Sequence, residues 1–182
     1  MITLYLVRHG RAAAGWDADP DPGLDHTGEA QARALAQAVG ALGPLELAVS
    51  PMRRTRETAA PLARQWAAEP RIEPRISEIA SPTDDLEARG RWLREIAGRE
   101  WAELDDGLRR WRDDVLAALL EAEEDTVFVT HFIAINAAVG LAVGNDRVVH
   151  CRPDYCSVTV LKSRGDGLEL MQLGAQADTR VL

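Results

Sequence analysis

Residues 6–11, LVRHGR, place two reactive side chains directly after a run of apolar residues that favours a β-strand. Arg8 is a planar cation that suits phosphate oxygens, and His9 is an imidazole that can act as a nucleophile or as a base. Gly10 follows them and lets the backbone turn closely beside both side chains. The segment therefore predicts an anion-binding or catalytic site at the end of the first strand.

Two later strand-like runs also end in polar residues. Ser50 and Arg54 follow one of them, and His131 follows the other. Together with Arg8 and His9, these residues would bring two guanidinium groups and two imidazoles to one pocket. Such a set can bind a dianionic phosphoryl group, stabilise its transfer without a metal, and offer a histidine as the nucleophile. A carboxylic acid at the rim would protonate the leaving oxygen and then activate water.

The elements that must position these side chains alternate between strand and helix. We predict strands at 2–7, 45–49, 71–76, 126–129, 157–162 and 168–173, and helices at 27–42, 52–68 and 134–143, with further helices between 81 and 122 broken near Gly98 and Gly107. This alternation predicts an α/β fold, a three-layer sandwich with a mostly parallel central sheet. Ligands of such sheets bind at the carboxyl ends of the strands, which is where His9 and His131 fall.

Ordered motifs along nearly the whole chain resemble those of the histidine phosphatase superfamily, also called the phosphoglycerate mutase-like family. Arg8-His9-Gly10 resembles the signature that follows the first strand of that family. The other matching segments are LDHTGEAQA (24–32), SPMRRTRETA (50–59), VTH (129–131) and the closing strand CSVTVL (156–161). The resemblance implies a phosphoglycerate mutase-like fold and a phosphoryl-transfer activity.

The resemblance also implies a role for five residues. His9 would be the nucleophile that becomes phosphohistidine, and Arg8, Arg54 and His131 would bind the phosphoryl group, with His131 completing the catalytic set. Glu78, in RISEIASP, would be the proton donor. The family needs neither a metal nor an organic cofactor, so we expect none here.

The sequence departs from the family pattern beside these residues. Arg11 follows Arg-His-Gly where Gln or Glu is common, and Phe132 follows the late histidine where Gly is common. The usual Gly-aromatic-Glu-Gly segment is missing after Glu78. A rim carboxylate paired with a surface arginine is therefore the alternative interpretation of Glu78, and Glu73 is its substitute as the acid.

Two features would shape the mouth of the pocket. Arg11 would add positive charge there or simply be solvated, and Trp16 would cover the site. A polar, Trp-containing stretch at about 81–112 reads as a small helical cap insertion that sets substrate choice, or as ordinary amphipathic packing. We take 1–182 as one domain that includes this insertion.

Composition restricts the partners. A net charge of −8 and a pI near 5.0 argue against nucleic acid or an anionic membrane as a partner. No apolar run approaches the ~18 residues of a membrane span. The two cysteines, Cys151 and Cys156, are too few for a disulfide-stapled secreted domain, so we expect a reducing, cytoplasmic location. The family resemblance also allows a homodimer.

From these observations we expect a metal-independent phosphomonoesterase that hydrolyses a small phosphorylated metabolite through a phosphohistidine intermediate. Four alternatives remain open at this point. They are a phosphoglycerate-type mutase, a protein phosphohistidine phosphatase, a non-catalytic phospholigand-binding protein, and a metal-dependent hydrolase that uses His9, His131 and a carboxylate.

Overall fold

The computed structural model describes residues 1–14, 19–83 and 85–177. Within them, a six-stranded sheet has the order β3-β2-β4-β1-β5-β6. The strands are β1 (Ile2–Arg8), β2 (Glu46–Val49), β3 (Arg71–Ile72), β4 (Thr126–Thr130), β5 (Val158–Ser163) and β6 (Leu168–Gln172). Strands β3, β2, β4 and β1 pair in parallel, whereas β5 pairs antiparallel with both β1 and β6. The mostly parallel sheet and its C-terminal hairpin are as predicted.

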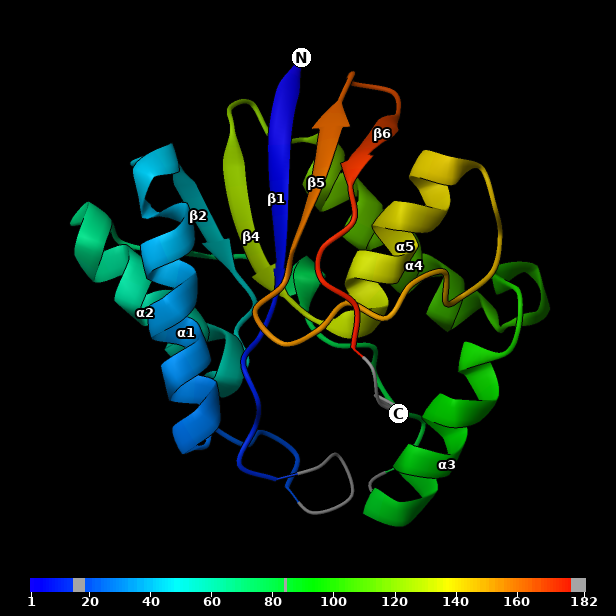
Figure 1. The fold of residues 1–182 in the computed structure, drawn as a ribbon. Helices are drawn as coiled ribbons and strands as arrows, with labels where there is room; N and C mark the ends of the chain where they lie inside the picture. The colour runs from blue at the N-terminus through cyan, green and yellow to red at the C-terminus, as the bar shows by residue number, and fades with distance from the viewer. Residues whose placement is uncertain (15–18, 84, 178–182) are drawn as a thin grey trace.

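Helices cover both faces of the sheet, which confirms the three-layer sandwich (Figure 1). The helices are α1 (His26–Val39), α2 (Arg53–Trp66), α3 (Leu86–Ala97), α4 (Asp106–Leu120) and α5 (Phe132–Val143), with 3-10 turns η1 (Gly40–Leu42), η2 (Pro74–Ile76) and η3 (Trp101–Glu103). Helices α1 and α2 pack on one face, and α4 and α5 pack on the other. Helix α3 lies beyond the carboxyl ends of the strands. None of the helices in the described part of the chain combines the length and the apolar character needed to cross a membrane.

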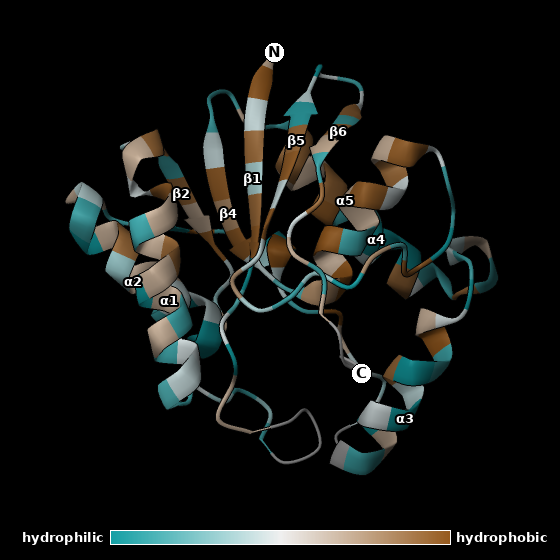
Figure 2. Cartoon of the chain, viewed as in Figure 1, coloured by the Kyte–Doolittle hydropathy of each residue, from teal (hydrophilic) through white to brown (hydrophobic). Residues whose placement is uncertain are grey.

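Alternation along the central strands builds two cores. On β1 and β4, Leu6 and Phe128 belong to the core under α4 and α5, whereas Val7 and Val129 belong to the core under α1 and α2. All four side chains are fully buried, because neighbouring residues of a strand point to opposite faces of the sheet. Hydrophobic residues accordingly predominate in β1, β4 and α5, whereas α1 and α2 mix hydrophobic and hydrophilic residues (Figure 2).

Several element boundaries differ from the predictions, and three of them concern a helix cap, the length of β3 and the start of α4. Helix α1 is capped by Asp25, whose carboxylate accepts from the backbone N–H of Gly28 at 2.7 Å, because the Thr27 hydroxyl is bonded to Arg11 instead. Strand β3 stops at Ile72, so the predicted strand 71–76 is wrong beyond that residue. Helix α4 begins at Asp106 with Asp105 as its cap, so Gly107 lies in its first turn and breaks nothing.

An ion-pair network explains why the chain turns after β3. The Glu73 carboxylate accepts from Arg71 at 3.1 Å and from the Arg75 guanidinium at 2.9 Å, and Arg75 also binds Glu121 at 2.7 Å. The backbone N–H of Arg75 donates to the same carboxylate, which folds residues 74–76 into η2. These bonds, chiefly those from Arg75, lower the pKa of Glu73 to about 2. The network therefore fixes the segment that leads from the sheet edge to Glu78.

Glu73→Gln should destabilise the fold in a pH-dependent way. The lowered pKa means that the ionised carboxylate stabilises the native state fully above its unfolded value near 4.5, and that this contribution is lost as the pH falls toward 2. We expect a loss of about 1–2 kcal/mol at pH 7, after allowance for the solvent that screens the half-exposed arginines. Urea denaturation at pH 7 and at pH 3 measures it. Glu69→Gln, at an exposed residue, is the control, and an equal cost for Glu73→Gln at both pH values would contradict the prediction.

Candidate active site

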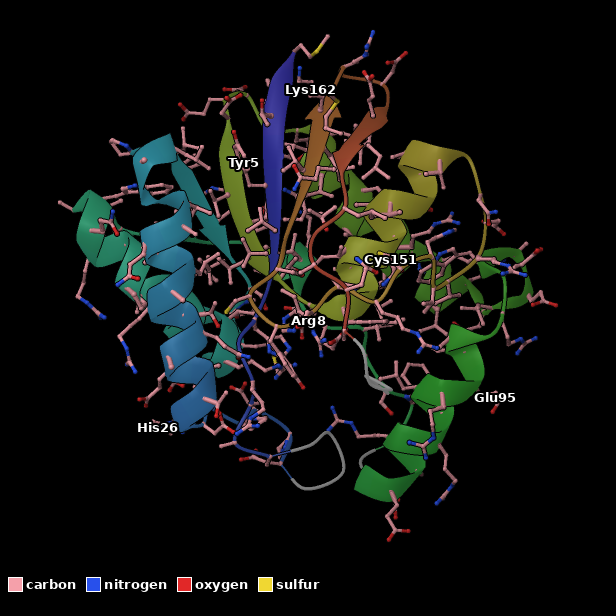
Figure 3. The ribbon with its side chains drawn as sticks, viewed as in Figure 1. Tyr5, Arg8, His26, Glu95, Cys151 and Lys162 are labelled. Carbon is pink, nitrogen blue, oxygen red and sulfur yellow. The ribbon has the colours of Figure 1, made fainter. Side chains whose placement is uncertain are left out.

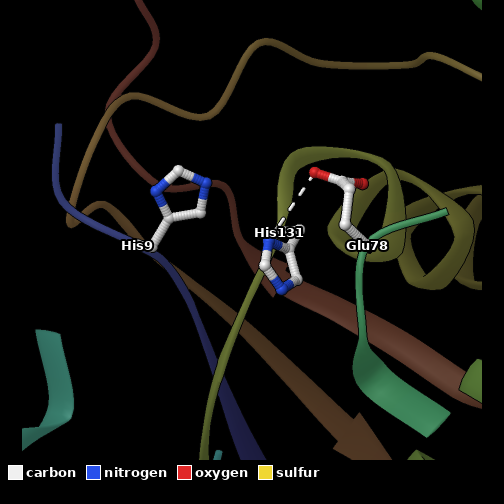
Figure 4. A group of neighbouring side chains, drawn as sticks. All are labelled: His9, Glu78 and His131. Carbon is white, nitrogen blue, oxygen red and sulfur yellow. Dashed lines mark ion pairs between the residues drawn. The ribbon is translucent and has the colours of Figure 1, made fainter. Parts of the chain in front are cut away.

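The carboxyl ends of three parallel strands bring the predicted residues together. Arg8 pairs in register with Thr130, so the residues that follow them, His9 and His131, lie side by side. Their ring centroids are 5.3 Å apart. Arg54 reaches the same point from the first turn of α2. Glu78 reaches it from the segment after η2, and Figure 4 shows its carboxyl group beside the ring of His131.

His9 has a defined tautomer. Its Nδ1–H donates to the carbonyl oxygen of Gly10 at 2.8 Å, so the lone pair lies on Nε2. The Arg54 Nε–H donates to that lone pair at 3.2 Å. Burial, and after it the charges of Arg54 and Arg8, hold the pKa of His9 well below 6.5. The ring is therefore neutral at physiological pH, with its nucleophilic nitrogen turned toward a guanidinium group.

Arg54 carries a buried charge that is only weakly paired among the described residues. Its side chain is 2% exposed, and its ion pair is a long contact of 3.8 Å with the half-exposed carboxylate of Asp21. Besides His9, its Nη2 faces the Nδ1 of His131 at 3.3 Å. Burying a cation against two neutral imidazoles is unfavourable unless an anion joins them. The arrangement is thus a site that an anion would complete.

Arg8 provides the second guanidinium group. Its Nη1–H donates to the Pro153 carbonyl at 2.9 Å, and the guanidinium carbon lies 4.1 Å from the ring centroid of Tyr155 and 5.4 Å from that of Phe132. Its buried Nε has no hydrogen-bond partner among the described residues. Figure 3 places Arg8 at the carboxyl end of β1, whereas His26 lies at the start of α1, away from the strand ends. The two flanking rings fix the orientation of this cation, and sequence reasoning missed the part played by Tyr155, which is far from Arg8 along the chain.

His131 and Glu78 lie next to each other on one side of the site. The Nδ1 of His131 lies 3.6 Å from Glu78 Oε2, and its Nε2 lies 2.8 Å from the Ser50 hydroxyl. Burial raises the pKa of Glu78, although the nearby Arg54 opposes the shift. Burial and the charge of Arg54 lower the pKa of His131. The site can therefore hold a protonated carboxylic acid next to a neutral imidazole, which suits proton donation to a leaving group.

The same three residues could be considered as metal ligands. One ligand atom from each of His9, Glu78 and His131 lies within 4.8 Å of the others. The Arg54 guanidinium, however, donates to the Nε2 of His9 and contacts the Nδ1 of His131, so a cation would have to displace a buried positive charge. The donor set fits an anion better than a cation.

The predicted mouth residues have different outcomes. Arg11 is half exposed and binds Asp25 at 2.6 Å and the Thr27 hydroxyl at 2.8 Å, at the start of α1. Its charge is therefore paired with a carboxylate at this helix start. Trp16 lies outside the described residues. On α3, Arg89 acts electrostatically on both Arg54 and Glu78, so this helix contributes charge to the site.

With this geometry established, comparison with known proteins identifies the class. A family profile described as Histidine phosphatase superfamily (branch 1) matches residues 4–176. The chain belongs to this superfamily. A relative from Enterobacter sp. (strain 638), named Probable phosphoglycerate mutase GpmB, is 30% identical over 167 residues, which cover 79% of this chain and 76% of the relative.

A second relative of the same name, from Photorhabdus laumondii, is 39% identical over 83 residues. That match covers 43% of this chain and 39% of the relative, so it spans well under half of that protein's length. The match to the Enterobacter protein covers a larger share of this chain.

Solved structures share the fold. A mycobacterial glucosyl-3-phosphoglycerate phosphatase in complex with VO3 aligns with a TM-score of 0.74 at 23% identity, covering 97% of this chain and 100% of the other. An Entamoeba histolytica phosphoserine phosphatase in complex with 3-phosphoglyceric acid aligns with a TM-score of 0.73 at 18% identity, covering 97% and 98%. At these identities the likeness establishes the fold alone.

A close backbone contact holds the Arg-His-Gly turn against α1. A Cβ atom added to Gly28 would lie 2.1 Å from the carbonyl oxygen of Arg11, and one added to Gly10 would lie 2.8 Å from the carbonyl oxygen of Gly28. The backbone N–H of Gly10 also donates to the Thr58 hydroxyl at 2.9 Å, which ties the turn to α2. The two glycines therefore allow the turn that follows His9 to pack directly against the first turn of α1.

Gly28→Ala should destabilise the fold by about 2–3 kcal/mol, because the backbone of Arg11 must move to admit the methyl group. Gly90→Ala in α3 is the matched control. Its added Cβ meets nothing closer than 3.5 Å, so the exchange should be neutral or stabilising by up to about 1 kcal/mol. Denaturant titration of both variants measures the difference. Similar stabilities for the two would show that the close approach of Gly28 to the Arg11 backbone does not constrain the turn.

Proposed function

We propose that the protein is a metal-independent phosphomonoesterase that works in two steps through phosphohistidine at His9. One observation carries the proposal: the neutral Nε2 of His9 faces the buried guanidinium group of Arg54, whose ion pair with Asp21 is long, at 3.8 Å, and the buried Nε of Arg8 nearby has no hydrogen-bond partner among the described residues. A phosphoryl group supplies the missing negative charge, and its phosphorus is an electrophile for that nitrogen.

In the first step, the Nε2 lone pair of His9 attacks phosphorus and the bond to the leaving oxygen breaks. Glu78, protonated because burial raises its pKa, gives its proton to that oxygen and becomes a carboxylate. In the second step, the Glu78 carboxylate takes a proton from water, whose oxygen attacks phosphorus. The P–N bond then breaks, inorganic phosphate leaves, and Glu78 is again protonated. Arg8, Arg54 and His131 stabilise the transferring oxygens in both steps.

The substrate we propose is a small phosphorylated metabolite. The names of the relatives and structural neighbours refer to phosphoglycerate, glucosyl-3-phosphoglycerate and phosphoserine, all of them small phosphate esters. The segment 81–112, which contains α3, is proposed as a cap that sets substrate choice, since Arg89 on this helix acts on the charges of the site.

A mutase is the second candidate, because the sequence relatives carry that name. Both activities share the first step and differ in what accepts the phosphoryl group. A mutase returns it to an organic acceptor, whereas a phosphatase releases it to water. We place hydrolysis first because solved structures that share the fold carry phosphatase names.

Rapid quench with a radiolabelled phosphate ester should trap an acid-labile, base-stable phosphoenzyme. The label should be absent in His9→Ala, because this change removes the nitrogen that we propose attacks phosphorus. It should persist in the control His26→Ala, at an exposed residue of α1. Label released as inorganic phosphate indicates a phosphatase, and label moved to added 3-phosphoglycerate indicates a mutase. A chelator should leave turnover unchanged. Turnover without a phosphoenzyme would overturn the two-step mechanism.

Glu78→Gln should slow substrates with poor leaving groups far more than substrates with good ones. We expect a kcat loss of roughly 10²–10⁴-fold on an alkyl phosphate, but on the order of 10-fold or less for the first step on p-nitrophenyl phosphate, whose leaving oxygen needs no proton. Burst kinetics separate the two steps.

The wild-type pH profile follows from the same pKa directions. Activity should persist well below pH 6.5, because His9 stays neutral there, and it should fall as the pH rises through the raised pKa of Glu78. The alkaline decline should vanish in Glu78→Gln. If Glu78→Gln instead slowed the alkyl phosphate and p-nitrophenyl phosphate equally, Glu78 would not be the acid.

A further inference from the structure

Each of the two ring nitrogens of His131 lies within hydrogen-bond distance of a neighbouring group that can donate a proton. The Ser50 hydroxyl lies 2.8 Å from Nε2, and the Nη2 of Arg54 lies 3.3 Å from Nδ1. His131 and Ser50 are both fully buried, so water does not compete for either nitrogen. A neutral imidazole has one ring lone pair and therefore accepts one such hydrogen bond, not two.

Hydrogen-bond accounting for Ser50 points to Nε2 as the acceptor. The Ser50 hydroxyl oxygen accepts from the backbone N–H of Met52 at 3.4 Å. The Thr55 hydroxyl lies 2.9 Å from the Ser50 carbonyl oxygen and 2.7 Å from that of Met52, so it offers the Ser50 hydroxyl proton no acceptor role that the structure shows. Among the hydrogen bonds of the described residues, the Nε2 of His131 is the acceptor within reach of the Ser50 hydroxyl proton. A buried hydroxyl that fails to donate loses a hydrogen bond. Ser50 and Arg54 thus compete for the one lone pair of His131.

Protonation does not resolve this competition. The charged and titratable groups that face His131 are Arg54 from α2, Arg8 and His9 from the end of β1, and Glu78 from the segment after η2. Burial and the arginines lower the pKa of His131 well below 6.5, so the ring stays neutral. Which nitrogen carries the single proton is then decided by its hydrogen-bond partners.

A phosphoryl group in the pocket changes the balance. Its oxygens accept hydrogen bonds, so they draw the donors of Arg54 away from Nδ1 and themselves require a donor there. We propose that Ser50 is a positioning residue that holds His131 as the Nδ1–H tautomer when the phosphoryl pocket is filled. The Ser50 hydroxyl donates to Nε2, and Nδ1–H donates to a phosphoryl oxygen. The His131 ring carries one proton in both the Nε2–H and the Nδ1–H tautomer. A shift from one tautomer to the other therefore neither takes up nor releases a proton.

This inference rests on the proposed function, because it assigns the phosphoryl group as the acceptor at Nδ1. It explains how a histidine too deeply buried beside arginines to hold a second proton can still donate a hydrogen bond to an anion. The backbone of Ser50 is held for this task, since its N–H donates to the Val129 carbonyl at 3.1 Å and its carbonyl is bound by Thr55.

The test is nitrogen-detected NMR of the full chain with labelled histidine, with and without inorganic phosphate. The His131 signals are assigned by their loss in His131→Gln. With phosphate bound, the wild type should show a protonated Nδ1 and an unprotonated Nε2. Ser50→Ala should shift the ring toward the Nε2–H tautomer and weaken phosphate binding roughly 10-fold near pH 7, the effect of one lost hydrogen bond.

Two variants separate this role from a structural one. Ser50→Thr keeps the hydroxyl and should restore both the tautomer and the affinity. Ser157→Ala removes another buried hydroxyl, one that has no hydrogen-bond partner among the described residues, and should change neither.

The outcomes distinguish this inference from the proposed function. If the wild type binds no phosphate and forms no phosphoenzyme, the proposed function fails, and the inference fails with it. If the wild type binds phosphate with a protonated Nε2 on His131, the inference alone is overturned, even if Ser50→Ala does not fold. The same holds if Ser50→Ala binds phosphate as the wild type does with an unchanged tautomer.

Discussion

The buried charge of Arg54 is the constraint on which the rest of the site depends. This guanidinium is 2% exposed and faces two imidazoles, with its nearest acidic oxygen 3.8 Å away. Burial, reinforced by this cation, keeps both histidines neutral, and the cation makes the pocket favour anions. The direction of every pKa shift at the site follows from burial, modified by this charge and by that of Arg8. The neutral imidazole of His9 and the raised pKa of Glu78 are thus two effects of the same burial.

The fold sustains this unfavourable arrangement by distributing its supports. His9 and His131 are held by neighbouring parallel strands, Arg54 by the first turn of α2, and Arg8 by the Pro153 carbonyl and the ring of Tyr155. The two hydrophobic cores, one on each face of the sheet, supply stability that offsets the cost of burying the charges of the site. Loss of any one support would leave the others in place, which favours loss of function over loss of folding when single site residues change.

Much of this could be predicted from the sequence, because strand ends in a parallel sheet share one edge. The sequence motifs identified the candidate site residues, and the shared edge of the sheet brings His9, Arg54 and His131 together. The missed features depend on contacts between residues far apart in the chain. Asp25, not Thr27, caps α1 because Arg11 takes the threonine hydroxyl, and β3 is short because Glu73 binds arginines on both of its sides. The partners of Arg8, and of each nitrogen of His131, were likewise invisible to sequence patterns.

The bond between the Nδ1–H of His9 and the carbonyl of the adjacent Gly10 has a regiochemical consequence. It blocks one ring nitrogen by a contact between neighbours in the sequence, so the block does not depend on distant packing. A phosphorylated His9 would then be the tele isomer, substituted at Nε2, and never the pros isomer, substituted at Nδ1. The two isomers differ in how readily they hydrolyse and in which reagents recognise them. A backbone carbonyl one residue away would thus determine the chemical identity of the intermediate.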